Sequence, residues 1–242
     1  MIFYIRSVNF PLKVFIPIRD LMYPHLCMAC DNLLSAGEEF ICIACRMQLP
    51  KTDYHTFFDN PVAKHFMGKF PFEGATGMFH FNKSSHIQKL LHNLKYKHQP
   101  EVGKVLGQIM GNAFITTSPY NTIDFIIPVP LHPMKQEQRG YNQSTMIAMG
   151  IADVMHIPVL ENALLRTAYT GTQTKKSRME RWENVKEKFA ANPKYIAELS
   201  SKHLLLIDDV ITTGSTLESC AMQLLRIPEI KISIAAAAHA EY

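Results

Sequence analysis

The segment at residues 203–219, with the sequence HLLLIDDVITTGSTLES, constrains the fold more than any other part of the chain. It begins with four apolar residues, 204–207, and then places two acids side by side, Asp208 and Asp209. A short loop of small residues follows, and after it apolar residues recur with helical spacing. The order of strand, acidic pair, loop and helix is typical of a unit in an α/β fold.

The loop after the acids is suited to hold a phosphate. Its residues are Thr212, Thr213, Gly214, Ser215 and Thr216. A loop of small residues that opens a helix presents free backbone N–H groups and the positive end of the helix dipole. Two carboxylates would repel a bare phosphate, so they favour a ligand that also carries hydroxyl donors or a bound Mg²⁺. A ribose 5-phosphate has a phosphate for the loop and a cis-diol for the acids.

Residues 204–216 resemble the phosphoribosyl-pyrophosphate (PRPP) motif of type I phosphoribosyltransferases. By that resemblance, Asp208 and Asp209 bind the ribose hydroxyls and residues 212–216 cradle the 5′-phosphate. The alternative is a buried parallel strand whose acids cap the next helix, although a cap needs only one such side chain. A nucleotide hydrolase that uses the acids as Mg²⁺ ligands is disfavoured, because the chain has no G-x-x-x-x-G-K-[ST] loop.

The composition sets broad limits. A chain of 242 residues suits one α/β domain with a small appendage. The net charge of +4 permits anionic ligands without requiring them. The first 24 residues are apolar, but Arg6, Lys13 and Arg19 interrupt them, so we predict neither a membrane-spanning helix nor a signal peptide. A cytoplasmic protein without membrane insertion is therefore expected.

Four of the five cysteines form two C-x-x-C pairs, Cys27 with Cys30 and Cys42 with Cys45. Each pair puts two thiolates on one tight turn, and two such turns can close a tetrahedron around Zn²⁺. We predict a structural zinc site at these four residues. Disulfides, redox chemistry and a metal-free remnant are the alternatives. A cytosolic setting disfavours disulfides, and the clustering of two pairs disfavours a thioredoxin-like redox role. Cys220 lies on the apolar face of a helix and is expected in the core.

The composition changes near residue 50. We therefore expect an N-terminal extension at 1–20, a zinc-binding segment at 21–50 and a phosphoribosyltransferase-like domain at 51–242. The largest part alternates strand and helix patterns, which predicts a twisted, mostly parallel sheet flanked by helices. Strands are expected at 77–82, 123–129, 157–165, 204–207 and 231–238.

A proline-rich turn at 128–133 ends one of the predicted central strands. Ligands of open α/β sheets bind outside the carboxyl ends of the strands, so this turn and residues 208–216 are expected to face one crevice. In type I phosphoribosyltransferases the matching loop holds the pyrophosphate. The groups here with suitable charge or donors are His132, Lys135 and Arg139, although His132 is equally compatible with a surface histidine beside a helix.

Two basic stretches have no single interpretation. Residues 95–97, Lys-Tyr-Lys, end a helix, and they fit a solvated basic face or a contact with phosphate or nucleic acid. Residues 166–188 have no clear period and are crowded with cations, among them Arg178 and Arg181. Type I enzymes close a flexible loop over PRPP at this point in the chain, which implies ligand contacts for Arg178 and Arg181. A disordered, solvated loop is the alternative.

The cysteine pairs and the motifs at 94–96, 128–132, 139–143 and 208–216, in this order, are similar to the ComF family of bacteria. The resemblance implies a type I phosphoribosyltransferase fold with a zinc-ribbon-like segment, a PRPP ligand with Mg²⁺, and an association with DNA uptake in natural competence. It names no acceptor. Two functions stay open. The first is transfer of ribose 5-phosphate from PRPP to an acceptor. The second is a PRPP- or nucleotide-responsive competence factor that binds single-stranded DNA without turnover, alongside other competence proteins.

Overall fold

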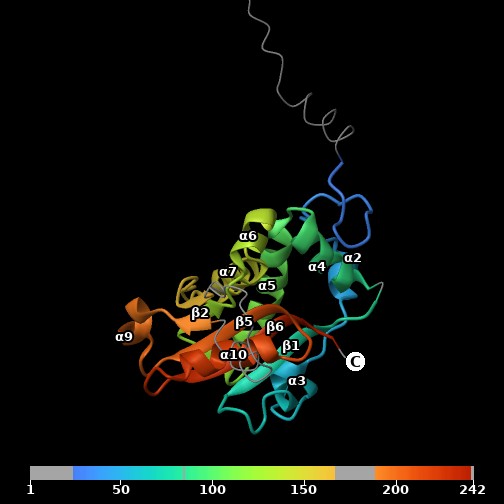
Figure 1. The fold of residues 1–242 in the computed structure, drawn as a ribbon. Coiled ribbons are helices and arrows are strands. Elements are labelled where there is room, and N and C mark those ends of the chain that lie inside the picture. Colours follow the sequence, from blue (N-terminus) through green and yellow to red (C-terminus); the bar gives the residue numbers. More distant parts are fainter. Residues whose placement is uncertain (1–23, 84, 167–188, 241–242) are drawn as a thin grey trace, which may run out of the picture.

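The computed structural model describes residues 24–83, 85–166 and 189–240. Four parallel strands form its main sheet, in the order β1-β6-β5-β2 (Figure 1). The strands are β1 (Gly74–His80), β6 (Lys231–His239), β5 (His203–Ile211) and β2 (Phe125–Pro128). Val159 adds an isolated parallel bridge to Ile126 beyond the β2 edge. The predicted parallel sheet is confirmed.

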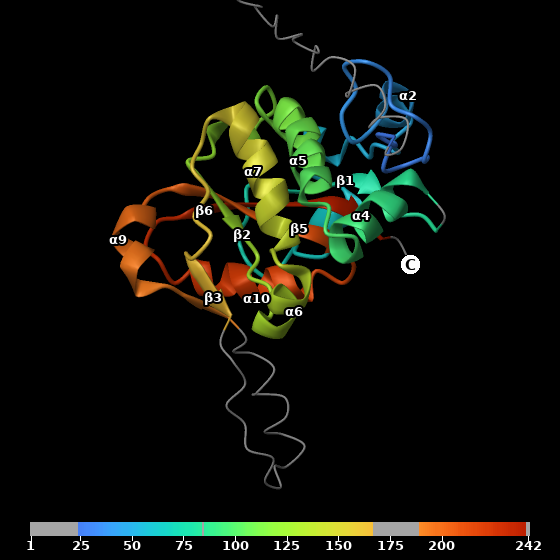
Figure 2. The same ribbon diagram turned by 90° about the horizontal axis from the view of Figure 1, so that it is seen from above.

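Helices cover both faces of the sheet (Figures 1 and 2). One face carries α4 (His86–Tyr96), α5 (Pro100–Phe114) and α7 (Gln143–Met155), and the other carries α3 (Pro61–Lys64) and α10 (Ser215–Leu224). The apolar residues of β5 pack into two hydrophobic cores, one on each face of the sheet. Leu205 and Ile207 pack on the first side, while Leu204 and Leu206 pack on the second. A strand buried on both faces needs a continuous apolar run, which explains the pattern in the sequence.

The smaller elements lie around this three-layer core. They are α2 (Ile43–Met47), α6 (Pro133–Arg139), α9 (Ile196–Leu199), β3 (Leu164–Arg166), β4 (Phe189–Ala191) and single 3₁₀ turns at Tyr54–Thr56, Tyr120–Thr122 and Pro193–Tyr195. Across the described ranges, no helix combines the length and the apolar character that a bilayer crossing requires.

The predicted strand at 157–165 is wrong in part. Only Val159 joins the main sheet, and the chain turns at residues 161–163 before Leu164 begins β3. β3 then pairs antiparallel with β4 in a separate two-stranded sheet. Polar residues at 161 and 162 interrupt the apolar run, and this break divides it between two sheets.

Helices α5 and α7 pack closely because each has a glycine at their crossing. A Cβ atom at Gly107 would lie 2.1 Å from the carbonyl oxygen of Ile147, and one at Gly150 would lie 2.0 Å from that of Lys104. Neither position can accept a side chain without moving a backbone. The close packing fixes α7, whose first turn reaches the candidate site.

Candidate ligand-binding site and cysteine cluster

Asp208 and Asp209 lie near the carboxyl end of β5, and each has a different partner. Asp208 Oδ1 accepts hydrogen bonds from Ser144 Oγ at 3.0 Å and from the backbone N–H of Asp209 at 2.8 Å. Asp209 Oδ2 pairs with Lys95 Nζ at 2.9 Å, and the two side chains are only 15% and 23% exposed. A neutral hydroxyl thus holds one acid, while an ammonium group holds the other.

This difference shapes the charge of the pair. Burial and the neighbouring charge of Asp209 raise the pKa of Asp208 to about 7, against the opposing effects of its hydrogen bonds and of Lys95. Two adjacent carboxylates in a desolvated site do not ionise equally. Near neutral pH Asp208 can therefore be either protonated or charged.

The loop between β5 and α10 combines a glycine in a left-handed conformation with exposed hydroxyls at the start of a helix. Gly214 adopts a left-handed φ of 73° and caps α10, and a Cβ atom there would lie 2.9 Å from the Phe66 ring. Thr213 Oγ1 donates to Ser215 Oγ at 3.2 Å. The backbone N–H of Ser215, the first residue of α10, points to Thr213 Oγ1 at 3.5 Å. The hydroxyls of the loop are exposed, and they lie at the positive end of the helix dipole, where an anion is favoured.

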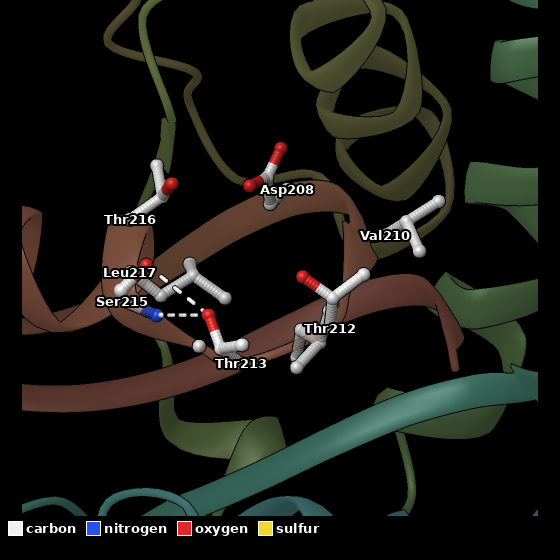
Figure 3. A pocket seen from close by; sticks show the side chains of 9 residues that line it. Asp208, Val210, Thr212, Thr213, Ser215, Thr216 and Leu217 are labelled. Atoms are coloured by element: carbon white, nitrogen blue, oxygen red, sulfur yellow. Dashed lines mark hydrogen bonds between the residues drawn. The ribbon is translucent and has the colours of Figure 1, made fainter. Parts of the chain in front are cut away.

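Six of the predicted site residues line one pocket (Figure 3). These are Asp208, Thr212, Thr213, Gly214, Ser215 and Thr216. Figure 3 shows the carboxyl group of Asp208 above the hydroxyl-bearing side chains of the loop. The Asp209 side chain is held by Lys95 from α4. The structure thus brings the first acid and the phosphate loop together.

The proline-rich turn after β2 lies at the same edge of the sheet. Val129 N–H donates to Ile207 O at 2.9 Å, immediately before Asp208. Asn142 Nδ2 donates to Val129 O at 2.9 Å, and the Asn142 carboxamide also caps α7 by accepting from Ser144 N–H at 3.1 Å. A chain of short contacts therefore connects the turn, the start of α7 and the acidic pair.

The three residues predicted to hold pyrophosphate make local contacts. His132 caps α6, where its Nδ1 accepts from the Met134 N–H at 3.3 Å, which is the helix-side role left open by the sequence. Lys135 is exposed on α6. Arg139 Nη1 donates to Gln143 Oε1 at 2.6 Å. Arg178 and Arg181, the other predicted ligand contacts, lie outside the described residues.

Tyr96 forms an exposed aromatic platform at the end of α4. Tyr96 is 60% exposed as a residue. The Arg139 guanidinium lies 5.4 Å from the centroid of its ring, and the centroid of the His92 ring lies 5.0 Å from it. Lys95, on the same turn, reaches Asp209. Within the basic triplet at 95–97, Lys95 thus pairs with Asp209, while Tyr96 is exposed to solvent.

Sequence reasoning missed two residues of the site, Ser144 and Lys95. The sequence singled out Lys95 as part of a basic face but gave no sign of its partner on a distant strand. Ser144 directly follows the 139–143 motif, which was the available signal. Both meet the acids only because α4 and α7 pack on the same face of the sheet.

The four N-terminal cysteines form a compact cluster. Their Sγ atoms all lie within 4.8 Å of one another, Cys30 and Cys42 are 3.9 Å apart, and all four are free thiols. Cys27 Sγ accepts backbone N–H groups from Ala29 at 3.4 Å and from Cys42 at 3.3 Å. Burial opposes ionisation of Cys27, yet these N–H groups lower the pKa of its thiol to about 7.

This arrangement fits a tetrahedral metal. Four thiolates at about 2.3 Å from a Zn²⁺ ion stand roughly 3.8 Å apart, close to the separation seen here. The N–H donors stabilise the thiolate form of Cys27, whereas burial and the neighbouring cysteines raise the pKa of the Cys45 thiol. The four cysteines could therefore hold one zinc ion. The turn within the spacer forms at Gly37, where φ is 88°.

The chain resembles proteins linked by name to DNA uptake and use. It is 27% identical to DNA utilization protein YhgH of Shigella flexneri, over 85% of this chain and 93% of that protein. It is 31% identical to competence protein F of Haemophilus influenzae, over 59% of this chain and 64% of that protein. It is 23% identical to competence protein ComFC of Bacillus subtilis, over 83% of this chain and 88% of that protein. The chain is a homologue of these three proteins. The resemblance that its motifs predicted is confirmed.

No protein-family model matches the chain. Among solved structures, a glutamine PRPP amidotransferase from B. subtilis is 20% identical, with a TM-score of 0.40 over 59% of this chain and 30% of that one. An adenine phosphoribosyltransferase from Leishmania tarentolae is 14% identical, with a TM-score of 0.37, over 80% of this chain and 94% of that one. These scores are below 0.5, so we draw nothing from them about the ligand.

Proposed function

We propose that the chain binds PRPP, together with the Mg²⁺ that this ligand carries, and transfers its ribose 5-phosphate group to an acceptor with release of pyrophosphate. One observation carries the proposal: a carboxyl group and a phosphate cradle line the same pocket at the start of α10. These are the two recognition elements that a ribose 5-phosphate needs. The names of the ComF homologues support a setting in DNA uptake.

The roles follow from the chemistry of the residues. The amides and hydroxyls of residues 212–216 would bind the 5′-phosphate. Asp208 and Asp209 would accept the ribose hydroxyls. When pyrophosphate leaves, the bond from the anomeric carbon to its oxygen breaks, and the sugar gains positive charge while the leaving group keeps the electron pair. The carboxylates favour the positive charge on the sugar.

The departing pyrophosphate needs cations. Mg²⁺, which arrives with PRPP, would neutralise part of this charge. We propose His132, Lys135 and Arg139 as further contacts, with Arg178 and Arg181 on the segment that follows β3. Arg139 is the last residue of α6, and its guanidinium lies over the Tyr96 ring and donates to Gln143 Oε1. A contact with pyrophosphate would require this side chain to leave these partners.

The cysteine cluster has a separate role in this proposal. The segment at 21–50 would be a zinc-binding unit ordered by Cys27, Cys30, Cys42 and Cys45, and the part at 51–242 would be the transferase domain. Small segments with little core of their own become ordered by binding a metal. No chemistry of the transfer step passes through this metal.

Pyrophosphate release tests the proposal directly. PRPP with Mg²⁺ would be incubated with the full chain and a panel of nucleobases, amines and oligonucleotides, and pyrophosphate would be measured by a coupled assay. We expect release with at least one acceptor class and its loss in the Asp208→Asn, Asp209→Asn double variant. Release that persists in the double variant would remove the acids from the mechanism.

A second candidate function is binding of single-stranded DNA without turnover. The Tyr96 platform favours it, because an exposed ring with an adjacent guanidinium suits base stacking. Salt-sensitive binding of an oligonucleotide, without pyrophosphate release from any acceptor, would support this candidate over the transferase.

A further inference from the structure

The last turn of α4 is attached to the cysteine segment. Asn93 Nδ2 donates to the carbonyl oxygen of Met28 at 2.8 Å, and Met28 lies between the two cysteines of the first pair. One turn earlier, Lys89 forms an ion pair with Asp31. The buried cysteines share one apolar core with the inner face of α4. Figures 1 and 2 show α4 beside the blue cysteine-bearing segment.

The same turn is attached to the candidate ligand site. The residue after Asn93 is Leu94, whose carbonyl oxygen accepts from Tyr141 Oη at 2.6 Å, just before α7. The next residue, Lys95, reaches Asp209 at 2.9 Å. Three consecutive residues thus contact the first cysteine turn, the start of α7 and the acidic pair. Since neighbours on a helix move together, a displacement at Asn93 also displaces Lys95.

We propose that Asn93 is a positioning residue that transmits the metal-bound state of the cysteine cluster to the Lys95–Asp209 pair and so sets the affinity for a ribose 5-phosphate ligand. This inference rests on the function proposed above. A turn closed around a metal holds the Met28 carbonyl in one orientation. An open turn releases it, and the last turn of α4 then loses its hydrogen bond to the cysteine segment.

A purely structural hydrogen bond would behave differently. Its loss would lower the free energy of unfolding but leave the affinity of the folded protein unchanged. A positioning role instead predicts that Asn93 and Lys95 act through one another, so their effects on affinity are not additive. It also predicts that the ligand and the metal strengthen each other's binding by the same factor.

The test measures ribose 5-phosphate affinity by calorimetry on zinc-loaded full chain, with zinc content and circular dichroism checked for each variant. We expect Asn93→Ala to weaken binding by about 5- to 20-fold, a coupling of ordinary size between sites. The matched control is Asn112→Ala, which removes a bond to Gln108 O within α5 and is expected to leave affinity unchanged. In a Lys95→Met background, Asn93→Ala should cause no further loss.

Zinc affinity gives an independent measurement. A chelator competition on the wild type measures zinc affinity with and without saturating ribose 5-phosphate. The ligand should raise zinc affinity by a certain factor, and zinc should raise ribose 5-phosphate affinity, relative to zinc-stripped protein, by the same factor. Unchanged affinity in Asn93→Ala, or losses that add to those of Lys95→Met, would overturn the inference while the proposed function stands. Wild-type protein that binds neither ribose 5-phosphate nor PRPP would instead remove the proposed function.

Discussion

Replacing Asp208 with asparagine should stabilise the free protein at alkaline pH. The ordinary carboxyl pKa is 3.8, and burial beside Asp209 raises that of Asp208 to about 7. Well below pH 3.8 the group is protonated in both the folded and the unfolded chain, so burial carries no charge penalty. The unfolded chain ionises first as pH rises, and the penalty grows until it is complete above pH 7. At about 1.4 kcal/mol per pKa unit, its upper bound is about 4 kcal/mol.

Asparagine removes the charge but keeps an Oδ1 that accepts from Ser144 and from the backbone of residue 209. We therefore expect the free energy of unfolding of Asp208→Asn to exceed that of the wild type by about 1–3 kcal/mol at pH 8, with little difference near pH 3. Urea titrations at both pH values measure this difference. The same variant should bind PRPP more weakly, because it has lost the carboxylate that would accept a ribose hydroxyl.

Asp209→Asn is the matched control. At pH 5, where Asp208 is protonated, it loses only the ion pair to Lys95 and should lower the free energy of unfolding by about 1 kcal/mol. If Asp208→Asn is no more stable than the wild type at pH 8, the charged form of Asp208 does not destabilise the folded protein, and the predicted cost of its burial is wrong.

Three further predictions concern other parts of the molecule. Gly214→Ala should unfold at least 1 kcal/mol more easily in urea and bind phosphate ligands poorly, because φ is 73° and the new Cβ meets Phe66; wild-type stability would contradict the loop geometry. Chelation should release one zinc per chain, and Cys45→Ser should purify with less metal by elemental analysis; reduced wild-type protein without zinc would defeat the site. Tyr96→Ala should weaken single-stranded DNA binding by about 5- to 50-fold in an anisotropy titration if the platform stacks bases, and unchanged binding would place DNA elsewhere.

The strands of the main sheet and the loop that opens α10 were predictable because local sequence determines them. The apolar run of β5, the acids after it and the glycine before α10 each carry a physical signature within a few residues. Parallel strands meet at one edge by their carboxyl ends, so the shared location of the proline-rich turn and the acids also followed. The clustering of the cysteines followed from their spacing.

The partners of the acids were not predictable. Lys95 and Asp209 are far apart in the sequence, and the pair forms only because α4 packs on the face of the sheet from which that side chain emerges. Nor did the sequence show that the residues after 160 leave the main sheet to form β3. His132 has the donors for pyrophosphate, but its capping of α6 depends on a local backbone bend.

Calorimetry of PRPP with Mg²⁺ on the zinc-loaded full chain tests the central claim most directly. We predict saturable binding at one site per chain, with a matching rise in melting temperature, and loss of both in the Asp208→Asn, Asp209→Asn double variant at unchanged circular dichroism. Well-folded wild-type protein that gives neither heat nor thermal protection would contradict a phosphoribosyl site at the start of α10.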